Sequence, residues 1–311
     1  MATTTTVTSN YAGKVAGQII GEAFKQADTL RLGLVTIQQN VNYKTNLRKI
    51  RYTDGTTNYS CGFTPEGALV LSEKVLQPKK LMNNIQICKE DFRQTWDEDL
   101  LGESASNPNM ASNIMEAIIM EVLSDQAQRV DSEIWTGNSA TDGEIGGFIP
   151  LFTADSDVIK ANNGITPSGN AITESTVEAE LKLALNAVPV AIRRNDLRVM
   201  VSPDVFQAYW FYLVSKGIAN DGNAEPKQTK FGRYVVTEVN GLPNNTIVIA
   251  QPKNLIFATG LLGDHNSIEM RDEDEIGLLT GMVRGKMVYN GGVNYYNGEE
   301  IVWYLSTTTP A

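Results

Sequence analysis

The sequence has very little of the chemistry on which most enzymes depend. Its 311 residues include one histidine, His265, and two cysteines, Cys61 and Cys88. A single histidine excludes most histidine-based metal sites and most acid–base pairs built on imidazole. Two cysteines this far apart form neither a zinc site nor a disulfide framework. The sequence therefore predicts no histidine-based or cysteine-based centre.

The sequence also lacks long apolar runs and an excess of positive charge. No apolar run approaches the 18 residues of a membrane-spanning helix, and the first ten residues are mostly polar. We therefore expect a protein that is neither exported by a signal peptide nor membrane-spanning. The chain has 26 Lys and Arg residues against 36 Asp and Glu residues, a net charge of −10. A protein that binds nucleic acid by neutralising phosphates is normally basic, so general nucleic-acid affinity is disfavoured.

One long helix is the most prominent element that the sequence predicts. Between Pro108 and Gly137 there is no other glycine or proline, and such a stretch makes about 40 Å of helix. Apolar side chains recur every three or four residues along one continuous stripe: Met115, Ile119, Leu123, Ala127, Val130 and Ile134. A second stripe covers only the first half: Ile114, Ile118 and Val122. In the second half we expect four side chains to face water: Asp125, Gln128, Arg129 and Glu133.

A long β-hairpin is predicted before this helix. Residues 54–68, DGTTNYSCGFTPEGA, are rich in turn-forming residues, and the flanking segments 49–53 and 69–76 are suited to pair with each other. Such a hairpin has few apolar residues with which to build a core of its own. We therefore expect its tip, Asp54 to Ala68, to be ordered only against another copy of the chain.

The remaining segments alternate between helix and strand patterns. We expect a helix over 11–27, strand-like residues from 30 to 52, and strands at 85–88, 197–201, 234–239, 246–250 and 255–259. Ser175 to Glu178 reads as a capping box that starts a helix with Val177, Leu181, Leu185 and Val188 on one face. A second helix runs from Pro203 to Gly217 with Phe206, Tyr209, Trp210, Leu213 and Val214 inward. A last hairpin is predicted over 278–289 and 293–305, with its turn at Asn290, Gly291 and Gly292.

Two glycine motifs resemble nucleotide-binding loops without matching them. Between Gly281 and Gly285 there are three residues, whereas a phosphate loop has four, and Met287 follows Lys286 where Ser or Thr should bind magnesium. The glycines of 143–147 lack both the dinucleotide-binding spacing and a preceding strand.

Three polar clusters are candidates for catalysis or metal binding, and each has a simpler structural explanation. His265 has only its near neighbours Asp264 and Ser267, and catalytic triads normally assemble from distant segments. The acidic runs 97–99 and 271–275 do not follow a calcium-loop pattern and are typical of solvated surface turns. We therefore predict no catalytic, cofactor-binding or metal-ligating residue, no cofactor and no enzymatic activity.

Five segments of the chain carry a family resemblance: FTPEGALVLSEKVLQPKKL (63–81), CKEDFRQTW (88–96), DSEIWTGN (131–138), NLIFATGLLGDHN (254–266) and GVNYYNGEEIVWY (292–304). They resemble major capsid proteins of tailed bacteriophages, and the last two resemble in particular those of phages of Bacteroidota-type hosts. The resemblance covers nearly the whole chain. It implies the α+β fold that these proteins share with herpesvirus capsid floors and encapsulin shells.

Mapped onto this chain, the resemblance implies five regions. They are an N-arm at 1–48, an extended hairpin or E-loop at 49–80, a P-domain with the long spine helix at 81–140, an A-domain at 141–250, and strands returning to the A- and P-domains at 251–311. The 217–230 loop of the A-domain would lie near the capsomer axis.

The function that the resemblance implies is structural. Many copies would assemble in the host cytoplasm into hexamers and pentamers of an icosahedral shell, and this virion capsid would enclose double-stranded phage DNA. The implied partners are other copies of the chain, with scaffolding, portal and decoration proteins, weakly contacted DNA and no membrane. Two alternatives remain at this point: an encapsulin-like cellular shell, and a metal-dependent α/β hydrolase that uses the acidic residues of 264–275.

Both cysteines are predicted to remain reduced thiols, because assembly in a cytoplasm is assembly in a reducing compartment. Cys61 lies near the hairpin tip and should react faster with an alkylating reagent than Cys88. Mass spectrometry of purified particles after alkylation without reductant measures both properties. A bridge between the two cysteines would contradict the prediction.

Overall fold

The structure of the protein is a computed structural model that describes residues 28–41, 43–52, 55–59, 61–62, 67–88, 112–161, 171–217, 228–260, 268–273 and 281–305. The helices and strands, in chain order, are α2 (Asp28–Arg31), β1 (Thr36–Gln38), β2 (Thr45–Tyr52), β3 (Leu69–Leu76), β4 (Lys79–Cys88), α5 (Ser112–Thr136), α6 (Phe148–Ala154), β5 (Ile159–Lys160), α7 (Val177–Asn186), η1 (Val190–Ile192), β6 (Arg198–Val201), α8 (Pro203–Ser215), β7 (Gln228–Phe231), β8 (Tyr234–Glu238), β9 (Thr246–Ala250), β10 (Leu255–Ala258), β11 (Ile268–Asp272), β12 (Met282–Tyr295), η2 (Gly298–Glu300) and β13 (Val302–Leu305). The helix predicted over 11–27 and the acidic run 97–99 lie outside the described residues.

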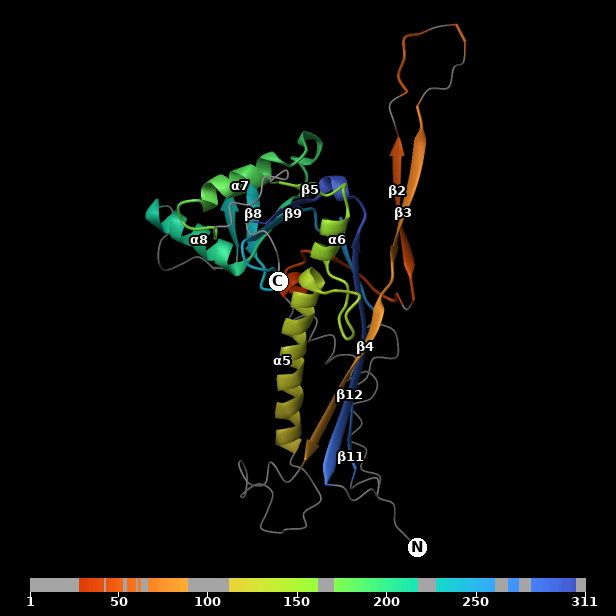
Figure 1. Cartoon of the computed structure of the whole chain (residues 1–311), viewed down its shortest axis with the longest axis vertical. Coiled ribbons are helices and arrows are strands. Elements are labelled where there is room, and N and C mark those ends of the chain that lie inside the picture. Colours follow the sequence, from red (N-terminus) through yellow and green to blue (C-terminus); the bar gives the residue numbers. More distant parts are fainter. Residues whose placement is uncertain are drawn as a thin grey trace.

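The elements form three parts that are distinct in Figure 1. A lobe holds α7, α8 and a six-stranded sheet in the order β5-β13-β9-β6-β8-β7. A long stalk holds α5 alongside β4, β12 and β11, and the β2–β3 hairpin extends away from both (Figure 1). The fold is therefore mixed α and β, as the sequence predicts.

The six-stranded sheet is covered on both faces because its strands are apolar on both sides. Val199, Val236 and Ile249 face the cluster formed with α7 and α8. Met200 and Val248 face the cluster formed with the end of α5 and with α6. Burial on both faces explains the continuous apolar runs of β6 and β9, since neither face of either strand meets water.

The spine helix α5 confirms the second half of the predicted stripe. Ala127, Val130 and Ile134 are buried, while Asp125, Gln128 and Arg129 are exposed. The side chains of 112–123 lie outside the described residues, so the first half of this stripe and the whole second stripe stay predictions.

Glu133 was expected to face water, and this expectation is wrong. Its side chain is buried because the chain beyond the helix returns along it. One carboxylate oxygen accepts from Arg129 Nε at 2.6 Å, and the other accepts from the backbone N–H of Ile145 at 3.2 Å. The carboxylate thus pairs an arginine on its own helix and fixes the loop that follows.

The predicted terminal hairpin with a turn at 290–292 is also wrong. Strand β12 continues through Asn290, Gly291 and Gly292. A Cβ on Gly292 would lie 2.9 Å from Pro78 Cα, and a Cβ on Gly291 would lie 3.0 Å from Ile145 Cγ2. The two glycines therefore serve close packing of the strand and not chain reversal.

The same glycine pair marks a change of strand partner. Residues 282–291 of β12 pair with β4, and residues 292–295 pair with β10. One strand thus joins the stalk to the centre of the molecule.

Three smaller expectations also need correction. The capping box does not form, because α7 begins after Thr176, whose side chain makes no cap hydrogen bond. Val214 of α8 is 40% exposed and not inward. Strand β2 begins at Thr45, four residues earlier than Lys49, because all eight of its residues pair with β3.

A buried carboxylate holds the start of the described chain to the spine. Asp131 Oδ1 accepts from the backbone N–H of Thr29 at 2.9 Å, and Trp135 Nε1 donates to the Thr29 hydroxyl at 2.8 Å. Burial raises the pKa of the Asp131 carboxyl above its ordinary value, although bonds from Thr29 partly offset this effect.

The helix phase is tested by comparing two alanine substitutions. Ile134 lies on the same stripe as Leu123 and is fully buried, so Ile134→Ala should lower the free energy of unfolding by about 2–5 kcal/mol. Gln128 is exposed, so Gln128→Ala should change it by well under about 1 kcal/mol. Urea titration of both variants measures the difference. A larger loss for Gln128→Ala would mean that the helix is rotated.

The Asp131 carboxyl should make stability depend on pH. Its raised pKa means that the folded chain holds a proton more tightly than the unfolded chain. The stabilisation that the protonated carboxyl gives the folded chain is therefore complete below the ordinary pKa of about 3.9. It is lost as the pH rises through the higher pKa of the folded chain. Asp131→Asn keeps an acceptor for Thr29 but removes the charge.

We therefore expect the Asp131→Asn variant to gain stability relative to wild type as pH rises from about 4 to 7. Thermal melts of both proteins across this range provide the measurement. Asp131→Ala, which also removes the acceptor, is the control and should be less stable than Asp131→Asn at every pH. Parallel curves for wild type and Asp131→Asn would contradict the prediction.

Candidate assembly surface

The β2–β3 hairpin has two chemically different faces. Opposed residues of an antiparallel pair point to the same side, and successive residues alternate. One face carries the pairs Leu47 with Lys74, Lys49 with Ser72, and Arg51 with Val70; the other carries Asn46 with Val75, Arg48 with Glu73, Ile50 with Leu71, and Tyr52 with Leu69. The first face contacts the body of its own chain and the second points away from it.

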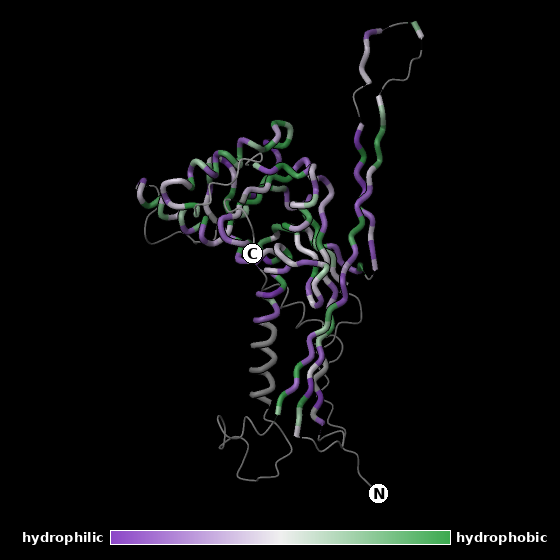
Figure 2. The backbone as a smooth tube through the Cα atoms, in the orientation of Figure 1, coloured by the Kyte–Doolittle hydropathy of each residue, from purple (hydrophilic) through white to green (hydrophobic). Residues whose placement is uncertain are grey.

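The second face carries an exposed apolar surface, which we call the outer patch: Ile50, Tyr52, Leu69 and Leu71. These side chains are between 64% and 66% exposed. Figure 2 shows apolar residues on the distal part of the hairpin, which projects away from the rest of the molecule. Monomeric proteins rarely leave such a group uncovered, so the outer patch is a candidate surface for contact with another molecule.

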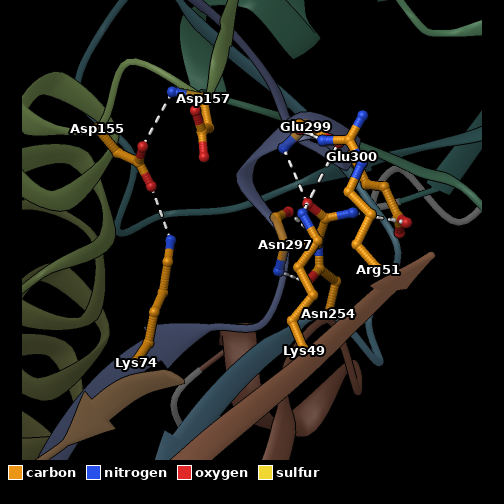
Figure 3. A network of polar contacts seen from close by, with 9 residues as sticks. All are labelled: Lys49, Arg51, Lys74, Asp155, Asp157, Asn254, Asn297, Glu299 and Glu300. Carbon is orange, nitrogen blue, oxygen red and sulfur yellow. Dashed lines mark hydrogen bonds and ion pairs between the residues drawn. The ribbon is translucent and has the colours of Figure 1, made fainter. Parts of the chain in front are cut away.

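A polar network attaches β2 to the body (Figure 3). Lys49 Nζ donates to Asn297 Oδ1 at 2.6 Å, and Arg51 Nη1 pairs with Glu299 Oε1 at 2.7 Å. Asn297 is itself fixed, because Asn254 Nδ2 donates to its carbonyl oxygen at 2.8 Å and its own backbone N–H donates to Asn254 Oδ1 at 2.9 Å. The body thus presents acceptors to the basic side chains of one hairpin face.

A second contact, which we call the latch, attaches β3. Lys74 Nζ pairs with Asp155 Oδ2 at 2.7 Å and lies 3.7 Å from the centre of the Tyr295 ring. The Tyr295 hydroxyl donates to the same Asp155 oxygen at 2.7 Å. Figure 3 shows Lys74 reaching from the hairpin toward Asp155. Three elements, β3, β12 and the segment after α6, therefore meet at one carboxylate.

The latch has a clear electrostatic signature. Partial burial alone would raise the pKa of Asp155, but the hydrogen bonds from Lys74 and Tyr295 outweigh it and lower the pKa to about 2. Burial and the neighbouring carboxylate raise the pKa of Tyr295. The latch carboxylate therefore stays ionised in any cellular compartment.

The base of the hairpin has a small apolar core. It consists of Val41, Leu47, Leu76, Ile256 and Ala258. Asn294 Nδ2 adds a hydrogen bond to the carbonyl oxygen of Val75 at 2.8 Å. The hairpin is thus fixed near its base, while the outer patch lies toward its distal end.

Those sequence candidates for catalysis that lie among the described residues do not assemble into a site. Gly285 and Lys286 lie within β12, and Glu273 is buried and pairs with Arg284 at 2.9 Å. The acidic run 271–275 is therefore not a fully solvated turn, since Arg271 and Asp272 belong to β11. His265 lies outside the described residues.

The glycines of 143–147 serve close packing at the end of the spine. A Cβ on Gly147 would lie 2.6 Å from Gly137 N.

Across the part of the chain that the structure describes, no group of three or more His, Cys, Asp or Glu side chains is placed to hold a metal ion. Within the same residues, no helix is long and apolar enough to cross a membrane.

Both cysteines are free thiols, with Cys61 exposed and Cys88 less so. The order of exposure agrees with the expected order of reactivity.

Comparison with known proteins identifies solved structures that share this fold. No protein-family model and no curated protein matches the chain. Among solved structures, a chain of the satellite phage P4 procapsid is 12% identical with a TM-score of 0.53, over 93% of this chain and 98% of the other. A chain from the capsid of a native GTA particle is 9% identical with a TM-score of 0.57, over 90% and 89% of the two chains. A chain from the capsid of cyanophage P-SCSP1u is 15% identical with a TM-score of 0.53, over 88% and 86%.

These similarities extend over whole chains, so they concern the complete architecture and not one shared motif. The chain therefore has the fold of tailed-phage capsid proteins.

The latch should contribute measurably to stability. In a double-mutant cycle with Lys74→Met and Asp155→Asn, we expect a coupling energy of about 1–2 kcal/mol, because hydrogen bonds to charged groups in partly buried sites are worth about this much. The exposed pair Arg48 and Glu73 is the matched control and should give less than about 0.5 kcal/mol. Chemical denaturation of the single and double variants measures both. Equal coupling in the two cycles would contradict a special role for the latch.

Proposed function

We propose that the protein is the major capsid protein of a tailed bacteriophage, a structural protein and not an enzyme. The observation that carries the proposal is the hairpin with two faces. Its basic face is bound to its own body, and its apolar outer patch points away, where a second copy of the chain can cover it. The shared fold with chains of phage procapsids and capsids supports the same role.

The size of the outer patch suits an assembly contact. Fully burying one such side chain contributes about 1.5–3 kcal/mol, so burying four that are two-thirds exposed contributes about 4–8 kcal/mol per hairpin. In a closed shell each copy would place its hairpin on one neighbour and cover the hairpin of another. The free energy of these contacts, summed over all copies, is then large, although each contact contributes only a modest amount.

We propose the division into regions that is expected for such a protein. We assign the N-arm to 1–48, the E-loop to 49–80, the P-domain with the spine helix to 81–140, the A-domain to 141–250, and the returning strands to 251–311. The pairing of β2 with β3 supports the E-loop, and the two separate core clusters support a division between lobe and stalk.

We further propose that copies assemble as hexamers and pentamers in the cytoplasm of a bacterial host of the Bacteroidota type. The finished virion capsid would enclose double-stranded DNA, with scaffolding, portal and decoration proteins as further partners. The net charge of −10 suits a wall into which DNA must be driven without tight binding.

Electron microscopy of the expressed full-length protein tests the function directly. Closed icosahedral shells, or tubes and rings of the same subunit, are the expected result. A protein that stays monomeric over a range of concentration and salt, with scaffolding protein added, would contradict the proposal. Shells isolated from cells that carry cargo protein and no genome would favour the cellular encapsulin-like alternative.

The hairpin assignment is tested by two changes. Deleting 55–66 should leave a folded, soluble chain that forms no closed shells. Tyr52→Ser with Leu71→Ser should have the same effect on assembly and should change the free energy of unfolding of the monomer by less than about 1 kcal/mol, because both side chains are exposed.

Leu183→Ser on α7 is the matched control, because Leu183 is an exposed apolar residue far from the hairpin in sequence. We expect it to assemble as wild type does. Light scattering and microscopy give the readout. Normal shells from the deletion, or equal loss of assembly in the Leu183 control, would contradict the assignment.

A further inference from the structure

Five basic side chains lie around one end of the lobe's sheet, in a chain whose net charge is −10. We call this group the basic edge: Arg193, Arg194, Arg198, Lys230 and Arg233. Arg193 and Arg194 follow η1, and Arg198 is the first residue of β6. Lys230 lies near the end of β7, and Arg233 lies in the turn between β7 and β8. They come from two stretches of sequence that are more than thirty residues apart.

The sheet register brings these two stretches together. Arg198 pairs with Val235 across β6 and β8, and Val235 pairs with Lys230 across β8 and β7. Paired residues share a face, so Arg198 and Lys230 stand on the same side of the sheet two strands apart, about 10 Å. The spacing is a consequence of strand pairing and does not depend on a flexible loop.

A hydrogen-bonded cluster holds the two loops against each other. Arg233 Nη2 donates to the carbonyl oxygen of Arg193 and, at 2.8 Å, to the Tyr234 hydroxyl. The Tyr234 hydroxyl donates to the Arg193 carbonyl oxygen at 3.1 Å, and the Arg233 guanidinium lies 4.9 Å from the Tyr234 ring. Arg193 itself donates to the carbonyl oxygens of Val188 and Asn186, both at 2.9 Å, beyond the end of α7 and in its last turn. These contacts fix the positions of two of the five charges.

Among the residues that the structure describes, few carboxylates neutralise the charges of the basic edge. Asp196 is the one carboxylate within the 193–198 and 228–235 segments; it is 79% exposed and lies 3.6 Å from Arg198. Arg194 and Lys230 are exposed, and their side chains make no hydrogen bond or ion pair with any described residue. Holding like charges together without partners is unfavourable, so the arrangement indicates an anionic ligand.

We propose that the basic edge binds the phosphate groups of nucleic acid, an inference that rests on the proposed function. Arginine presents a planar fork of donors that matches a phosphate, and lysine adds a compact charge. A nucleic-acid strand carries one negative charge every 3.4 Å or so, so one strand crossing the edge can contact several of these cations in succession. An acidic protein segment is the alternative ligand, but its carboxylates need not follow such a regular spacing.

The contact is weak in each copy and repeated over many copies. A surface site with a few phosphate contacts binds strongly only at low salt, since affinity falls as released counterions are replaced. Weak repeated contact is consistent with a chain that is acidic as a whole, because the remaining surface repels nucleic acid.

The test uses full-length protein and a short fluorescein-labelled DNA duplex, with binding measured by anisotropy as a function of salt. Arg194→Gln with Lys230→Gln should lower affinity about tenfold and reduce the slope of log affinity against log salt by about 2. Lys80→Gln with Lys286→Gln is the matched control, because it removes two exposed positive charges from the stalk. The control should change affinity by less than twofold.

Three results would overturn the proposal: no binding by the wild-type protein at low salt, equal loss in the two double variants, or competition by polyglutamate as effective as competition by DNA at equal charge. Microscopy of the same samples separates this proposal from the shell function. Shells of the Arg194 and Lys230 variant should form as in wild type, so a failure of DNA binding with normal shells leaves the shell function intact.

Discussion

The architecture depends on one strand that is shared between two regions of sheet. Strand β12 pairs with β4 and β11 along the stalk and then with β10 at the centre of the molecule. The change of partner falls at Gly291 and Gly292, where the absence of side chains lets the chain before β4 approach at Pro78. The hairpin leaves the body at this point. Its position is therefore defined by close backbone packing before any of its polar contacts is considered.

The polar contacts then decide which way the hairpin faces. Lys49 and Arg51 bind acceptors near η2, and Lys74 binds the latch carboxylate of Asp155. Each ion pair at the surface would contribute little by itself. Together they contact only one face of a two-stranded sheet, so they orient that sheet as a unit and leave the outer patch for another molecule. A hairpin with few residues to form its own core is consistent with this division, because in the proposed shell a neighbouring copy would cover its apolar face.

Much of the fold was predictable from local patterns, and the failures have physical causes. The stripe through Val130 and Ile134 predicted the buried face of the spine, because helical periodicity is a local property. Glu133 was misassigned because its burial depends on the returning loop at Ile145, which sequence spacing does not reveal. The glycines after Asn290 were interpreted as a turn because Asn-Gly is a strong turn signal, whereas tertiary packing required small residues there. The latch had no sequence signal at all, since its three members are separated by more than 80 residues in one case and 140 in the other.

The two-faced hairpin has a consequence for symmetry. In the proposed shell, the outer patch of one copy is covered by a different surface of its neighbour, which makes the contact heterologous, head to tail. Contacts of this kind do not end with a pair: they continue to a third copy, and the angle between successive copies decides whether they close into a ring or extend as a filament. Because Lys49, Arg51 and Lys74 together orient the hairpin on the body, these three contacts would help to determine how many copies complete the ring.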